Sequence, residues 1–97
     1  MANQATLSGV LAEKKAKRFT PAGVPVLECL LEHSAKVMEA GSERSLEFLI
    51  KAKAMGQAAE RLERITLGSK LVAQGFLAPA RQHSKQIIFH VTNFELE

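Results

Sequence analysis

The stretch Thr20-Pro21-Ala22-Gly23-Val24-Pro25 predicts a tight reversal between two extended segments, and the other elements follow from it. Pro21 fixes its own φ and disfavours helix at the residue before it. Gly23 takes a positive φ at no steric cost, and Pro25 directs Val24 toward an extended conformation. We therefore predict a hairpin with one strand on each side of this turn.

Alternation of side chains along the chain predicts five strands. Leu27, Cys29 and Leu31 share one parity and are expected to be buried, whereas Glu28 and Glu32 share the other. Helix is a competing interpretation for residues 24–33, and propensity alone allows helix throughout 42–65. The predicted strands cover residues 5–12, with a basic extension over 13–19, and then residues 24–33, 46–54, 71–78 and 87–94.

Two further segments complete the predicted order. Ala58, Leu62 and Ile65 repeat at helical spacing, which predicts a helix over residues 57–64. Residues 37–45 are predicted to be a polar connection around Gly41.

Three strands, one helix and two strands match an all-β fold, the five-stranded OB-fold Greek-key barrel with one short helix between strands three and four. We expect a single domain over residues 1–95, with Leu96-Glu97 as a possible tag scar.

Composition limits the function classes. The 97 residues carry a net charge of +3, with five Phe and no Tyr or Trp. A mildly basic chain permits a polyanionic partner without requiring one, and so few aromatic residues argue against a large stacking platform. The single cysteine indicates a reducing compartment, and neither a signal peptide nor a membrane span is visible, so we expect a cytoplasmic protein without membrane association.

No group of residues has the spacing of a catalytic or metal site. Gly68-Ser69-Lys70 lacks the rest of a phosphate-binding loop, and Cys29 and His33 have no second pair of ligands. We therefore expect no enzyme activity, no cofactor and no metal. Phe48, Phe89 and Phe94 are expected in the core.

Basic residues form three groups that an OB-fold would bring near its oligonucleotide-binding face. That face covers strands two and three and is flanked by the loops between strands 1–2 and 4–5. We expect a phosphate-tracking groove there, although each group by itself is also compatible with a solvated surface. Phe19 has two interpretations, a base-stacking ring or a plug of the barrel end. The three groups are Lys14, Lys15, Lys17 and Arg18, then Lys51 and Lys53, then Arg81 and Lys85.

A set of ordered motifs resembles the primosomal replication protein N (PriB) family, bacterial relatives of single-stranded DNA-binding protein. The resemblance covers about Thr6 to Phe94. It implies a homodimer of OB-folds, joined through the strand-1 region, that binds single-stranded DNA and contacts the primosomal helicase during replication restart. The motifs are Thr20 to Pro25, Leu31-Glu32-His33, Ala40-Gly41, Gly68-Ser69 and Gln74-Gly75-Phe76-Leu77.

The resemblance also implies site residues. Arg18, Arg44, Arg81 and Lys85 match basic positions of the family, while Glu47 replaces a stacking aromatic and Ser34 an arginine. We expect weak, non-specific binding, because the absence of one stacking aromatic costs about 1–3 kcal/mol. The alternative function is an adaptor OB-fold that binds proteins and has little affinity for DNA. The predicted nucleic-acid-binding residues are Arg18, Arg44, Lys51, Lys53, Arg81 and Lys85.

Overall fold

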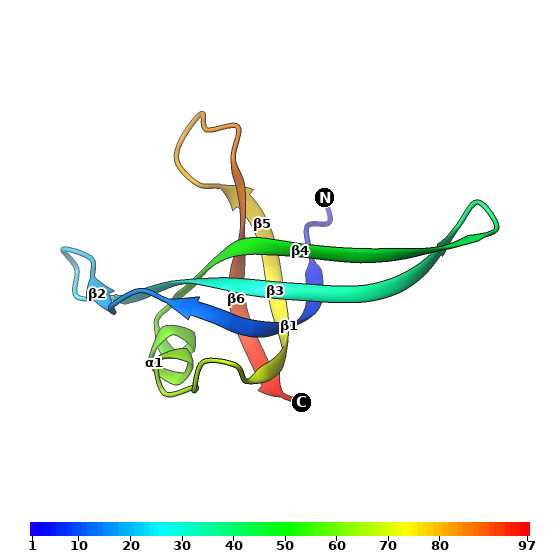
Figure 1. Cartoon of the computed structure of the whole chain (residues 1–97). Coiled ribbons are helices and arrows are strands. Elements are labelled where there is room, and N and C mark those ends of the chain that lie inside the picture. Colours follow the sequence, from blue (N-terminus) through cyan, green and yellow to red (C-terminus); the bar gives the residue numbers. More distant parts are fainter.

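The computed structural model describes residues 1–97 as six strands and one helix (Figure 1). The observed order confirms the predicted three strands, helix and two strands, with one additional two-residue strand, β2, at the first turn. The elements are β1 Ala5–Lys14, β2 Arg18–Phe19, β3 Pro25–Glu39, β4 Ser42–Met55, α1 Gln57–Glu63, β5 Lys70–Pro79 and β6 Ile87–Leu96.

Five strands close into a barrel in the order β1-β5-β6-β4-β3, and β3 pairs back with β1. All of these pairings are antiparallel except β4 with β6, which is parallel over Ala52–Ala54. β1 takes part at both ends of the series because its first half pairs with β5 and its second half with β3. This is the predicted OB-fold.

The turn between β2 and β3 forms as the sequence predicted. Thr20 N donates to Val24 O at 2.9 Å, and Gly23 N donates to Thr20 O at 2.8 Å. Gly23 has a φ of 85°, the conformation that its missing Cβ permits. Phe19 beside the turn is 58% exposed, so it does not plug the barrel end.

The prediction of a polar connection over residues 37–45 is wrong. β3 and β4 stay paired from Val26↔Met55 out to Glu39↔Ser42, and only Ala40 and Gly41 form the turn. Residues 33–48 therefore project from the barrel as a two-stranded extension, called the ribbon below (Figure 1). Backbone pairing between the two segments maintains them as strands although no core covers either face.

One core fills the barrel. Ala58, Ala59 and Leu62 of α1 are buried in it, so the helix closes one end of the barrel. Phe89 and Phe94 belong to this core as predicted, but Phe48 is 40% exposed because it lies on the ribbon, beyond the barrel. No helix is long and apolar enough to cross a membrane. The other core residues are Leu11, Leu27, Cys29, Leu31, Ala52, Ala54, Leu71, Ala73 and Val91.

Candidate nucleic-acid interface

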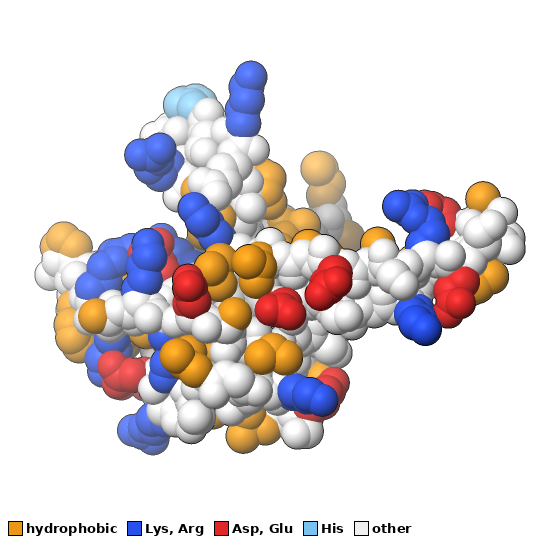
Figure 2. Space-filling view, viewed as in Figure 1, with side chains coloured by type: hydrophobic (Ala, Val, Ile, Leu, Met, Phe, Trp, Pro, Cys, Tyr) orange, Lys and Arg blue, Asp and Glu red, His pale blue; other side chains and the backbone are white.

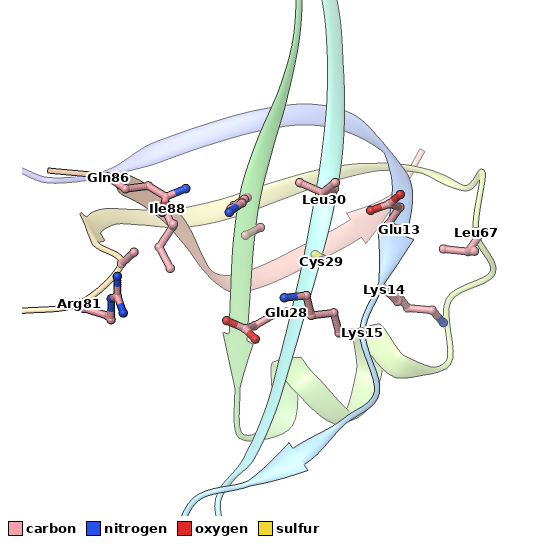
Figure 3. A pocket seen from close by; sticks show the side chains of 13 residues that line it. Glu13, Lys14, Lys15, Glu28, Cys29, Leu30, Leu67, Arg81, Gln86 and Ile88 are labelled. Carbon is pink, nitrogen blue, oxygen red and sulfur yellow. The ribbon is translucent and has the colours of Figure 1, made fainter. Parts of the chain in front are cut away.

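A groove of about 570 Å³ lies on the outer side of β3 and β4, between the segment after β1 and the β5–β6 loop (Figure 3). Leu30 and Ile88 are among its apolar lining residues. In the close view Arg81 lies at one side of the groove and Lys14 and Lys15 lie at the other, with Glu28 between them. The charged lining residues are Glu13, Lys14, Lys15, Glu28, Lys51 and Arg81.

Not every basic residue near the groove is free to bind an anion. Lys14 Nζ donates to Glu63 O at 2.8 Å and to Ile65 O at 2.6 Å, so it caps the carbonyl end of α1. Lys17 Nζ pairs with Glu60 at 2.9 Å and with Glu63 at 3.2 Å, and the Glu60 hydrogen bond is the main cause of its raised pKa. These two lysines attach the helix to the β1–β2 segment.

The predicted residues Lys51 and Arg81 do meet at the groove, from β4 and from the β5–β6 loop. Both are exposed, and neither forms an ion pair. Lys15 joins them from the segment after β1 and is also exposed. Three cations from three separate elements therefore face the same space.

Arg18 and Lys53 flank Glu28 at the edge of the groove. Arg18 Nη2 lies 4.0 Å from Glu28 Oε2, and Lys53 is the β4 partner of Glu28 in the strand register. Both cations therefore lie on the same part of the surface as Glu28, although only Arg18 is within ion-pair distance of it. The predicted residues Arg18 and Lys53 thus lie beside the groove but do not line it.

The β5–β6 loop is stabilised by its own hydrogen bonds. Ala80 N donates to Gln86 O at 2.8 Å, and Ser84 N donates to Arg81 O at 2.9 Å. His83 has a φ of 64°, a left-handed conformation that tightens the loop. Lys85 is exposed on this loop but does not line the groove.

Arg44 lies far from the other predicted residues. It is on the ribbon, in cross-strand register with Val37, and it forms an ion pair with Glu39 at the tip. Figure 2 shows Lys and Arg gathered around β2 and the β5–β6 loop, with acidic side chains over the middle of β3 and β4. The structure therefore brings the predicted cations together around the groove, with the exception of Arg44.

Side-chain alternation makes the outer face of the ribbon acidic. Glu47 and Ser34 are cross-strand partners on this face, and Glu43 and Lys36 lie further out. Glu32 precedes the ribbon on the same face. The two departures from the family pattern, Glu47 and Ser34, are thus adjacent in space.

Cys29 at the groove is buried, as the side-chain alternation predicted. Burial raises its pKa to about 11, although the charge on Lys14 opposes this shift. A raised pKa favours the protonated thiol at neutral pH, which is less reactive than the thiolate. No group of three or more His, Cys, Asp or Glu side chains is placed to hold a metal ion.

The sequence interpretation missed the apolar part of the groove. Leu30 shares the outer parity of Glu28 and Glu32, and Ile88 lies at the start of the last strand. An apolar residue on an expected outer face was the available signal for Leu30. Ile88 gave no such signal, because only barrel closure brings β6 beside β4.

A closed OB barrel with basic residues along its β3–β4 face has the architecture of oligonucleotide-binding OB-folds. The chain matches a family described as "another single-strand binding protein family" over residues 3–93. Replication restart protein PriB from Bordetella pertussis is 45% identical over 89 residues, which cover 92% of this chain and 83% of the relative. PriB from Nitrosomonas europaea is 37% identical and covers 92% of this chain, with 82% of its own length matched.

Solved structures agree with this assignment. The structure of PriB from Ralstonia solanacearum has a TM-score of 0.91 at 38% identity, covering 100% of this chain and 99% of that one. The single-stranded DNA binding protein from Thermus aquaticus has a TM-score of 0.77 at 21% identity, covers 99% of this chain and 50% of its own, and shows the shared fold. The chain belongs to the PriB family of single-strand binding proteins.

Proposed function

We propose that this protein binds single-stranded DNA in the groove and acts as an accessory protein of replication restart. The observation that carries the proposal is the meeting of Lys15, Lys51 and Arg81, from three elements, over an apolar surface. Such an arrangement suits a phosphate backbone with bases directed toward Leu30, which is half-buried, above the buried Ile88. Arg18, Lys53 and Lys85 extend the positive field beyond the groove.

Binding without strong sequence preference follows from the same residues. Lysine and arginine contacts to phosphate carry no sequence information, and apolar contacts accept every base. Glu13 and Glu28 oppose the cations of the groove, which supports modest affinity.

Fluorescence anisotropy with labelled oligo-dT at two salt concentrations tests the proposal. We expect binding that weakens as salt rises, because bound phosphates release counterions. Oligonucleotides of different base composition should bind within about tenfold of each other, that is, within ~1.4 kcal/mol. Absence of binding even at low salt would contradict DNA binding by this chain.

We also propose that the protein is a homodimer. The inner face of the ribbon continues the core-facing side of β3 and β4, and it exposes Phe48 and Val37 to solvent. The two lie on the same face with Ala35 and Leu46 between them, and an apolar face of this kind is typical of an interaction surface. The neighbouring strand β1 contacts this face, since His33 Nδ1 lies 2.6 Å from Ser8 O, so a contact through the strand-1 region would include it. Sedimentation is expected to show a dimer mass, and a monomer mass would contradict this proposal.

The family resemblance supports a role in assisting the primosomal helicase in the cytoplasm. A helicase assay with wild type and with a variant that does not bind DNA separates this role from the adaptor alternative. Stimulation that disappears together with DNA binding supports the accessory function. Stimulation that persists supports an adaptor, which the acidic outer face of the ribbon favours because it repels phosphate.

A further inference from the structure

The rings of Phe76 and His90 stack on each other on the outside of the barrel. Their centroids are 4.9 Å apart and their planes meet at 13°, close to parallel. Phe76 is 38% exposed, so a substantial part of its surface is accessible to solvent. An exposed, nearly parallel pair of this kind offers a flat apolar surface of the type on which a nucleobase stacks.

The ring pair and two charged residues at the edge of the groove, Glu28 and Lys53, form one row of cross-strand neighbours. The strand registers pair Glu28 with Lys53, Lys53 with His90, and His90 with Phe76, so the row crosses β3, β4, β6 and β5. Lys53 is thus the neighbour of the ring pair on one side and of Glu28 on the other.

The row is adjacent to the groove. Along β4 Lys53 follows Lys51 by two residues, and along β6 His90 follows Ile88 by two. Two residues along a strand span about 6.6 Å on the same face, similar to the spacing between neighbouring nucleotides of an extended strand. A single strand leaving the groove over β4 and β6 therefore meets Lys53 and the rings next.

Gly75 allows the ring pair to form. A Cβ at this position would lie 1.7 Å from His90 O, so only glycine permits β5 to approach β6 so closely. The register also shifts between Gln74 and Gly75, which sets Phe76 opposite His90. The neutral form of His90 suits stacking, and burial together with the charge on Lys53 lowers its pKa.

We propose that Phe76, His90 and Lys53 form a nucleotide subsite, in which a base stacks on Phe76 and Lys53 contacts a phosphate. This inference rests on the proposed binding of single-stranded DNA. It supplies a stacking surface on the barrel, whereas Glu47 on the ribbon offers none.

Two measurements with the full chain test the subsite. Ultraviolet crosslinking of oligo-dT to the wild-type protein should attach thymidylate to Phe76, within the tryptic peptide of residues 71–81. In anisotropy, Phe76→Leu removes the ring but keeps an apolar side chain, and it should weaken binding about fivefold or more. Phe76→Trp and His90→Phe preserve stacked rings and should retain wild-type affinity.

The matched control is Ile87→Ala, which shortens an apolar side chain on β6 that is 51% exposed but outside the row. Unchanged affinity is expected there. Unchanged affinity of Phe76→Leu, or crosslinks that map only to other peptides, would show that the pair serves sheet stability alone and would overturn the subsite. Failure of wild type to bind oligo-dT at low salt would instead overturn the proposed function and the subsite with it.

Because the crosslink is measured on wild type, poor folding of a variant does not prevent a decision. Thermal unfolding of each variant then distinguishes weaker DNA binding by a folded protein from a failure to fold.

Discussion

β3 and β4 form two regions with the same backbone pairing and different surfaces. In the barrel their outer face carries Lys51 and Lys53, and their inner face is buried in the core. In the ribbon the outer face carries Glu43 and Glu47, and the inner face exposes Phe48 and other apolar side chains. One continuous ladder thus changes from a cationic, covered region to an acidic, uncovered one.

Continuous backbone pairing therefore does not by itself extend a binding surface along β3 and β4. A single strand that follows the outer face from Lys51 toward the tip meets Leu49 and Glu32, and then Glu47. Like charges would repel its phosphates there, so we expect the DNA path to be confined to the barrel. The uncovered apolar face of the ribbon suits protein contact. The following experiments test this division.

The largest effect is expected from reversing charges in the groove. Lys51→Glu combined with Arg81→Glu should weaken oligo-dT binding by roughly 100-fold at low salt, because two attractive interactions with phosphate become repulsive. The slope of log affinity against log salt should fall by about 0.7 for each phosphate that is no longer neutralised. Lys36→Glu makes one such charge reversal on the ribbon and should have little effect, whereas Lys51→Glu alone should already weaken binding clearly. An equally large decrease in affinity for Lys36→Glu would show that the ribbon also holds DNA.

The second effect concerns the inner face of the ribbon. Phe48→Glu should weaken the dimer by about 30-fold, since burial of a large apolar side chain contributes ~2 kcal/mol. Sedimentation over a range of concentrations measures the change. Met38→Glu adds the same charge on the outer face of the ribbon and should leave the dimer intact. A dimer unaffected by Phe48→Glu would exclude this face from the interface.

A smaller effect, an increase in affinity for DNA, is expected when the acidic residues on the outer face of the ribbon are neutralised. Glu43→Gln with Glu47→Gln should raise affinity for a long oligonucleotide about threefold to tenfold, because repulsion along the ribbon is removed. Affinity for an oligonucleotide that only fills the groove should stay the same. Glu95→Gln with Glu97→Gln is the control for net charge. Equal gains on both lengths would mean that net charge, and not the ribbon, limits binding.

The smallest effect concerns how the stability of the barrel against unfolding depends on pH. The pKa of His90 is lowered in the folded protein by burial and by Lys53, so the unfolded chain takes up the proton first as pH falls. Stability contributed by neutral His90 is present above the unfolded pKa of about 6.5 and is lost below it. Thermal unfolding from pH 7.5 to pH 5 should show a slightly smaller decrease in stability for His90→Phe than for wild type. Equal decreases would contradict the sign of this shift.

Local patterns predicted the elements of the barrel well. Period-two alternation identified the barrel strands, and Pro21 with Gly23 predicted the turn. The ribbon was missed because residues 37–45 are polar and contain Gly41, which is typical of a connection. Its strands persist through pairing with each other, and a pattern read along one segment does not contain that information.

The candidate site was predicted in part. Lys51 and Arg81 were identified as site residues and line the groove, whereas Arg44 was identified as well but lies on the ribbon. Lys14 and Lys17 have the same charge as the groove cations, yet they bind α1. The sequence shows which side chains are charged. Whether a charged side chain is free to bind DNA depends on partners that are distant in sequence.

The order and period of side chains were sufficient to determine the barrel, its short helix and the turn over Thr20 to Pro25, because these depend on interactions between near neighbours. Tertiary structure alone determined which cations face the groove and how far the β3–β4 ladder extends. It also brought Phe76 against His90 and beside Lys53. The reason is that strand registers and barrel closure join residues far apart in the chain, and those contacts establish which side chains remain free to bind.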